Sequence, residues 1–238
     1  MNPFDKPSVA LFQGRHFNSE IVTLCDRWNV TYKLSYRDLA EMMAERHVDL
    51  AHTTIMRWVQ RYIPEFEKRW WRYAQPVGMS WRIDETYIKL KGQWVYLYRG
   101  VDKAGQTIDF FLSEHRDIAA AKRFLQQAIA KRGIPQKLTL DGYAASHEAV
   151  GELQKEGVLP ADLIVRTSKY LNNVIKQDHR RVKQRVRPML GFKRFDHAAI
   201  TLSGIELVHQ IKKNQFALSG LCAPRARTPQ VWDSVLAA

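Results

Sequence analysis

Two aspartates lie in predicted strands at positions where a carboxylate needs an explanation. Asp84 falls inside the apolar run from Trp81 to Ile88, and Asp141 ends a short run at 138–140, directly before Gly142. A carboxylate at the C-terminal end of a sheet strand is a frequent site position. Two such carboxylates suit Mg²⁺ or Mn²⁺, which favour oxygen ligands, and two ions about 4 Å apart can activate a nucleophile on a phosphodiester. The alternative for each aspartate is a turn cap or a surface charge.

The positive charge of the chain is concentrated in its last third. The 238 residues include 37 Lys and Arg and 24 Asp and Glu, a formal net charge of +13. Residues 166–238 hold 14 basic and 4 acidic residues, a net charge of +10. The densest run follows His179 and contains Arg180, Arg181, Lys183 and Arg185. Like charges this close repel unless an anion offsets them. We therefore expect these residues and His179 to contact DNA; the alternatives are a solvated helix face and a helix-surface histidine.

Composition excludes several classes of protein. Hydrophobic residues make up 45% of the chain, a globular value that excludes a disordered basic tail protein. No apolar run approaches the ~20 residues that span a bilayer, and the N-terminus shows no secretory pattern. The two cysteines lack disulfide-scaffold or metal-ligand spacing. We expect a cytoplasmic protein, not bound to membrane, whose partner is a polyanion.

The first 65 residues read as short helices. Ser35 precedes an apolar stripe and is a plausible N-cap, and a second helix from His52 to Tyr62 is expected to end at Pro64. A helix, a turn and a second helix with polar residues at its start are typical of a helix-turn-helix. The expected DNA contacts there are Ser35, Thr53, Thr54, Arg57 and Arg61, because Thr and Arg can bond base edges or phosphates from the major groove. The alternative is an ordinary three-helix packing unit.

Beyond residue 80 the periodicity changes to that of strands. Three β-rich runs over 81–113, with hairpin-like breaks at 91–92 and 103–105, precede alternating helices and short strands. This order predicts an α/β fold, a ribonuclease-H-like mixed sheet with flanking helices, preceded by an all-α helix-turn-helix domain. The expected boundaries are 1–65 for the helix-turn-helix region, 66–79 for a linker, 80–215 for the catalytic domain and 216–238 for a loose basic tail. We expect five tryptophans to serve packing rather than base stacking: Trp58, Trp70, Trp71, Trp81 and Trp94.

Several stretches in order, from Gly14 to about Asn214, resemble the transposases of the insertion-sequence 6 family, the IS26-like group. The matching stretches are 35–39 (SYRDL), 54–61 (TIMRWVQR), 84–87 (DETY), 94–102 (WVYLYRGVD), 169–174 (KYLNNV), 177–181 (QDHRR) and 191–192. The resemblance implies a ribonuclease-H-like domain with an Asp-Asp-Glu triad and two Mg²⁺ or Mn²⁺ ions. Asp84 and Asp141 match the two aspartates.

The third catalytic position departs from the family pattern. The family reads Asn-Asn-x-Ile-Glu-Gln-Asp-His, and here the glutamate position is Lys176, at the expected 35 residues from Asp141. A charged lysine has no lone pair for a metal and repels cations. Asp178 is a poor replacement, since two helical residues turn the side chain about 200° away, and Glu85 is expected on the opposite strand face.

The resemblance implies a DNA transposase that binds terminal inverted repeats and catalyses metal-dependent strand cleavage and transfer, impaired in this copy by Lys176. Its partners would be double-stranded DNA, as element ends and target, and further copies of the chain in a homo-oligomer. Its place would be the bacterial cytoplasm, at the nucleoid. The alternative is a catalytically inactive DNA-binding protein that acts as a repressor or inhibitor of active copies. A third hypothesis, a ribonuclease-H-like nuclease, gives no role to a helix-turn-helix.

Overall fold

The computed structural model describes residues 10–12, 17–168, 173–189, 191–223 and 226–238. An all-α part comes first, with a 3₁₀ turn η1 (Ala10–Phe12), then α1 (Ser19–Thr31), α2 (Tyr36–Ala44) and α3 (His52–Trp71). Residues 14–16, at the start of the region that resembles the family, and residues 169–172 of the matched stretch 169–174 lie outside the described residues. None of the helices in the described part is long and apolar enough to cross a membrane.

A five-stranded mixed sheet forms the second part. Its strands are β1 (Ser80–Leu90), β2 (Gln93–Asp102), β3 (Thr107–Ser113), β4 (Lys137–Leu140) and β5 (Ile164–Thr167), in the order β3-β2-β1-β4-β5. The first three pair antiparallel, and β4 and β5 continue parallel to β1. This topology confirms the predicted ribonuclease-H-like mixed sheet, and both predicted hairpin breaks lie between its strands.

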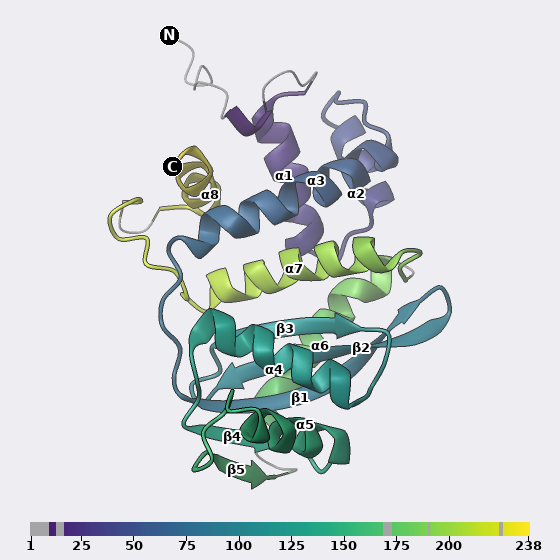
Figure 1. The fold of residues 1–238 in the computed structure, drawn as a ribbon. Helices are drawn as coiled ribbons and strands as arrows, with labels where there is room; N and C mark the ends of the chain where they lie inside the picture. The colour runs from purple at the N-terminus through teal and green to yellow at the C-terminus, as the bar shows by residue number, and fades with distance from the viewer. Residues whose placement is uncertain (1–9, 13–16, 169–172, 190, 224–225) are drawn as a thin grey trace.

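Helices cover both faces of the sheet, because successive side chains of its strands point to opposite faces and pack against different helices. On β2, Tyr98 stacks on Phe124 of α4 (Ile118–Arg132), while the next residue, Arg99, faces α6 (Asn173–Val186) and α7 (Phe195–Lys212). Figure 1 shows α4 and α5 (Ala144–Lys155) in front of the sheet and α6 behind it. The helix α7 lies between the sheet and α3, and its residues from 201 to 210 are buried on all sides.

The helix α3 differs from the prediction at its C-terminal end. It does not stop at Pro64 but continues to Trp71, so residues 66–71 of the expected linker are helical. A proline inside a helix removes one hydrogen bond and costs about 3 kcal/mol. Tyr62, Ile63, Phe66 and Trp70 are fully buried around it, and each large buried side chain contributes about 1.5–3 kcal/mol. Packing of this face therefore outweighs the cost.

The expected loose tail is also corrected by the structure. A 3₁₀ turn η2 (Arg187–Met189) follows α6, and near the C-terminus residues 228–237 form the helix α8 (Thr228–Ala237). Trp232 is 1% exposed and packs edge-on against Phe66 and Trp70 of α3. One buried aromatic anchor with Val235 and Leu236 orders a segment whose Ala- and Pro-rich sequence gave little helical signal.

Candidate active site

The strand β1 leaves its neighbour β4 at the residues that carry the acidic pair. Only Ser80, Trp81 and Arg82 of β1 pair with β4. Asp84 and Glu85 follow directly, and Asp141 comes one residue after the end of β4. The parallel pairing of β1 with β4 therefore ends directly before the two acidic residues of β1.

Three carboxylates meet where this pairing ends. One oxygen from each of Asp84, Glu85 and Asp141 lies within 4.8 Å of the other two. The structure therefore brings the two predicted aspartates together. Glu85 pairs with Tyr98 and lies on the face that α4 covers, as strand alternation predicted, but its carboxylate still reaches the two aspartates. Three carboxylate oxygens are a donor set that fits a hard divalent cation.

Arg116 holds the carboxylate of Glu85, and Tyr143 holds that of Asp141. The Arg116 Nε donates to Glu85 Oε1 at 2.7 Å, and its guanidinium lies 3.8 Å from the centroid of the Tyr143 ring. The Tyr143 amide donates to Asp141 Oδ1 at 3.0 Å, and its hydroxyl donates to the Arg116 carbonyl at 2.7 Å. Arg116 and Tyr143, which contact each other, thus connect the Glu85 carboxylate to the Asp141 carboxylate.

Lys176 enters the same site from α6. A pocket of about 600 Å³ is lined by residues of β1 and α6, which are Asp84, Glu85, Thr86, Lys176, His179, Arg180, Lys183 and Gln184, and by Arg187. Burial raises the pKa of Asp84 to about 7, helped by the negative charges of Glu85 and Asp141, while the Lys176 charge lowers it. The ammonium therefore acts on the Asp84 carboxyl from the expected position of the third acidic residue.

His179 and Asp178 are both buried, but they serve different parts of the structure. His179 is 6% exposed, so it is not a helix-surface residue, and its Nδ1 lies 3.8 Å from Asp84 Oδ2. Burial and the nearby Arg99 charge lower the pKa of His179 to about 3, so the imidazole is neutral. Asp178 turns away from the pocket and accepts hydrogen bonds from Arg99 and Lys213. This agrees with the expectation that Asp178 cannot replace the glutamate.

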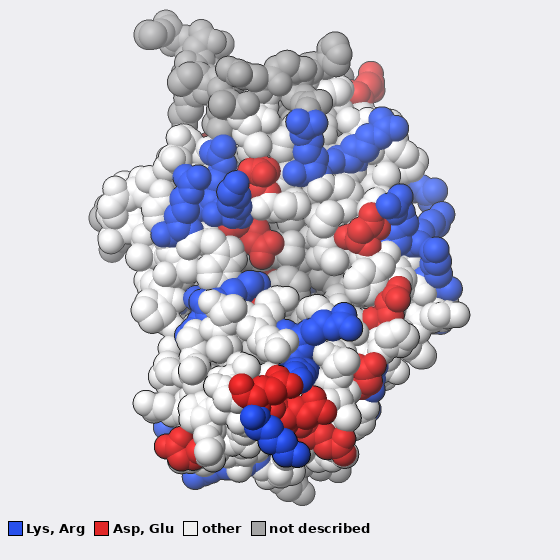
Figure 2. Space-filling model, in the orientation of Figure 1, with Lys and Arg blue, Asp and Glu red and all other residues white. Residues whose placement is uncertain are grey.

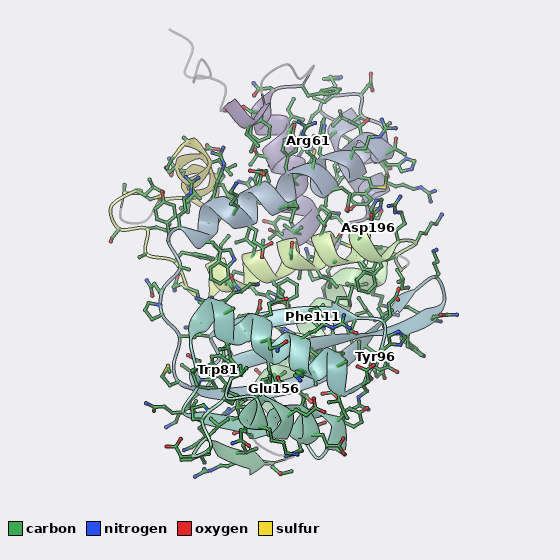
Figure 3. All side chains as sticks on the ribbon, in the orientation of Figure 1. Arg61, Trp81, Tyr96, Phe111, Glu156 and Asp196 are labelled. Carbon is green, nitrogen blue, oxygen red and sulfur yellow. The ribbon has the colours of Figure 1, made fainter. Side chains whose placement is uncertain are left out.

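Apart from His179, which is buried, the predicted DNA contacts fall into two surface groups and two structural exceptions. Arg180 and Arg181 of α6 are exposed and Lys183 is half-buried. On α3, Thr53, Arg57 and Arg61 are exposed and Thr54 is half-buried; Figure 3 labels Arg61 in the helical layer. Figure 2 shows that acidic residues gather over the front of α4 and α5, where Lys122 pairs with Glu152 and Glu156. The helix α6 is on the opposite face of the sheet.

Ser35 and Arg185 are the two exceptions. The Ser35 hydroxyl accepts from the Asp38 amide, and Asp38 accepts from the Ser35 amide, which forms a capping box at the start of α2. Arg185 is 8% exposed and donates to the Asn29 carbonyl at 3.4 Å. Burial lowers the pKa of Arg185 to about 10. Its guanidinium points into the helical layer, so we leave it out of the DNA-contacting surface.

Comparison with solved structures gives distant matches. The catalytic core domain of BIV integrase has 16% sequence identity and a TM-score of 0.42, over 55% of this chain and 83% of the integrase chain. The HTLV-2 integrase catalytic core domain in complex with magnesium has 14% identity and a TM-score of 0.44, over 66% and 96% of the two chains.

Comparison with curated proteins gives much stronger matches. The transposase for insertion sequence-like element IS431mec of Staphylococcus aureus strain Mu50 is 39% identical over 208 residues, which cover 87% of this chain and 91% of the relative. The transposase for insertion sequence element IS257 in transposon Tn4003 of Staphylococcus aureus matches over the same extent. A family model described as a DDE domain matches residues 78–215. The chain belongs to the DDE transposases of the insertion-sequence 6 family.

Proposed function

We propose that this chain binds duplex DNA at the terminal inverted repeats of its element, and that its strand cleavage and transfer are impaired by Lys176. The observation that carries the proposal is the position of Lys176, which lines the same pocket as Asp84 and acts on its carboxyl. DNA binding is supported by the exposed Arg57 and Arg61 on α3 and by Arg180 and Arg181 at the pocket. Two DNA ends must be held together for transposition, so the active assembly would be a homo-oligomer at the nucleoid.

The carboxylates of Asp84, Glu85 and Asp141 would hold a divalent ion, for which we propose Mg²⁺. Such an ion supplies positive charge at the phosphate under attack. Arg116 keeps Glu85 in place, while Arg180 and Lys183 can hold DNA phosphates at the mouth of the pocket. The chain therefore retains the groups that position a DNA strand beside the acidic cluster.

Lys176 opposes the cation in two ways. Its ammonium has no lone pair to offer as a ligand, and its positive charge adds to that of any ion at the carboxylates. With one ligand position of the family triad lost, the geometry that places a second ion is incomplete. The expected result is DNA binding with weak or absent catalysis.

The second candidate is a DNA-binding protein without any catalysis, which represses its element or inhibits active copies by mixed assembly. The same position of Lys176 favours it, because an ammonium in the pocket with Asp84 can offset part of the negative charge of the acidic cluster without metal. The two candidates differ only in whether residual strand transfer remains.

A strand-transfer assay with labelled element ends and Mg²⁺ tests the proposal. The variants are Lys176→Glu, Lys176→Gln as the matched control that removes the charge without adding a ligand, and Asp141→Asn as the inactive reference. We expect Lys176→Glu to gain at least about tenfold in strand transfer over the unmodified chain, since loss of interactions at a metal site commonly costs 10–100-fold. Lys176→Gln should gain less.

The outcomes separate the hypotheses. Equal activity of the unmodified chain and Lys176→Glu would show that position 176 does not limit catalysis. Weak but metal-dependent activity of the unmodified chain supports the impaired transposase, and a level equal to that of Asp141→Asn supports the inactive DNA-binding protein. Binding of terminal-repeat DNA in EDTA should be the same for all four proteins.

A further inference from the structure

Two large aromatic side chains are exposed beside the pocket, on the hairpin formed by β1 and β2. Tyr87 is 49% exposed and Trp94 is 54% exposed, which corrects the expectation that Trp94 serves packing. Their ring centroids lie 4.7 Å apart at an interplanar angle of 73°. With Tyr96, which faces Tyr87 across the strands, they line a hollow of about 180 Å³. Figure 3 labels Tyr96 where the hairpin leaves the body of the sheet.

Lysines lie over both exposed rings. The Lys183 Nζ is 3.9 Å from the centroid of Tyr87, and the Lys89 Nζ is 5.5 Å from that of Trp94. Lys183 also lines the pocket that contains Asp84. The aromatic surface is therefore continuous with the candidate active site, and it is positively charged along its length.

The hairpin is held in place, so the aromatic surface is preformed. The Lys91 amide donates to the Phe192 carbonyl at 2.8 Å, and Leu90 and Phe192 form a parallel β-bridge. Phe192 is 9% exposed. These contacts fix the outer end of the hairpin to the segment that follows α6, and Figure 1 shows the hairpin extending past the helices at that edge.

We infer that Tyr87 and Trp94 bind an unpaired nucleobase of the DNA strand that runs into the pocket. Every base offers a π-face, and stacking on an aromatic side chain is a sequence-tolerant interaction. Lys89 and Lys183 supply the positive charge that the flanking phosphates require. The inference rests on the proposed function, that the chain binds DNA, and it adds a site for a strand that has left the duplex.

The charge at this surface argues against a second copy of the chain as its occupant. Protein–protein interfaces are enriched in aromatic residues but depleted in lysine. Here a lysine lies over each of the two exposed rings, and one of them, Lys183, also lines the pocket that includes Arg180 and Arg187. A polyanion complements this surface, whereas a copy of the same basic surface would repel it.

The test compares two DNAs of the same sequence, one blunt and one with a short single-stranded overhang that contains 2-aminopurine. Binding is measured in EDTA, so that catalysis plays no part, by fluorescence anisotropy for the dissociation constant and by 2-aminopurine emission for stacking. The variant is Trp94→Ala, with Trp94→Phe to restore an aromatic face and Tyr32→Ala as the matched control, since Tyr32 is 55% exposed at the end of α1.

We expect the unmodified chain to bind the overhang DNA about tenfold more tightly than the blunt DNA, which corresponds to about 1.4 kcal/mol. Trp94→Ala should lose this preference and the change in 2-aminopurine emission, while its affinity for blunt DNA stays within twofold. Trp94→Phe should retain most of the preference, and Tyr32→Ala should retain all of it. Circular dichroism checks that each variant is folded.

Two results would overturn the inference. The first is an unmodified chain that binds both DNAs equally, and the second is a Trp94→Ala protein that keeps the preference. If in the second case Trp94→Ala also loses self-association in sedimentation velocity, the surface belongs to a second copy of the chain. Failure of the unmodified chain to bind any DNA would instead reject the proposed function, so the two failures are distinguishable.

Discussion

Arg99 and Glu206 form an ion pair in the interior, where Arg99 Nη2 donates to Glu206 Oε2 at 2.7 Å. The arginine side chain is 0% exposed and that of the glutamate 1%. Arg99 also donates to Asp178 at 3.4 Å, so one guanidinium joins β2 to both α6 and α7. Since α6 carries Lys176, this buried network fixes the helix that brings the lysine to the pocket.

Removal of the arginine should destabilise the protein strongly. Arg99→Met leaves the carboxylates of Glu206 and Asp178 buried without their main partner, and loss of one member of a buried pair costs about 3–5 kcal/mol. Urea unfolding followed by circular dichroism measures the change. The matched control is Arg194→Ala, which breaks the exposed pair with Asp196 and should leave the midpoint unchanged. An unchanged midpoint for Arg99→Met would show that the network adds no stability.

The stability of the protein should depend on pH through Glu206. Burial alone would raise the pKa of Glu206, but the charges of Arg99, His209 and Lys213 outweigh it and hold the pKa at about 2, below the ordinary 4.5. A depressed pKa contributes stability that is complete above the unfolded-state value and is lost as the pH falls toward 2.

A comparison with Glu206→Gln isolates this contribution. The gap in free energy of unfolding between the unmodified chain and Glu206→Gln should be largest above pH 4.5. It should shrink by about 3 kcal/mol as the pH falls to 2, at 1.36 kcal/mol per pKa unit. Urea unfolding at several pH values from 2 to 6 measures it. A gap that does not change with pH would contradict the depressed pKa.

The contact of α7 with α1 and α3 should not tolerate a methyl group at Gly204. A Cβ there would lie 2.6 Å from Val30 Cγ1 and 3.1 Å from Ile63 Cδ1. We expect Gly204→Ala to lower the free energy of unfolding by about 1–3 kcal/mol, as overpacking does in other cores. Gly151→Ala on α5 is the control, since nothing lies within 4 Å of its Cβ position, and it should stabilise by about 0.4–1 kcal/mol. Equal midpoints for the two variants would refute the close approach.

The basic face of α3 should determine how DNA binding depends on salt. Arg57→Ala and Arg61→Ala should each weaken binding of terminal-repeat DNA and reduce the slope of log affinity against log salt by about 1, if each arginine contacts one phosphate. Filter binding at several salt concentrations measures both quantities. Lys155→Ala, at the exposed end of α5, should change neither. A larger effect of Lys155→Ala would place the DNA on the other face of the sheet.

The sequence predicted the strands around Asp84 and Asp141 because alternation and hairpin breaks are local signals. It did not place Glu85 in the acidic cluster, because alternation assigns a residue to a face of its strand but does not show which side chains reach a residue that follows another strand. It ended α3 at Pro64 because the cost of a proline is local, whereas the burial of Phe66 and Trp70 that offsets it comes from distant helices. The same distant packing makes α8 an ordered helix.

The sequence by itself was enough to identify the family, the sheet and the presence of Lys176 at the glutamate position, because these follow from residue types and their spacing along the chain. The tertiary structure decided which of these groups meet. It brought Glu85 into the acidic cluster, turned Arg185 inward to Asn29, and left Trp94 exposed beside Lys89. Each outcome depends on how elements that are distant in the sequence lie relative to one another. The periodicity of a single strand or helix gives no information about that.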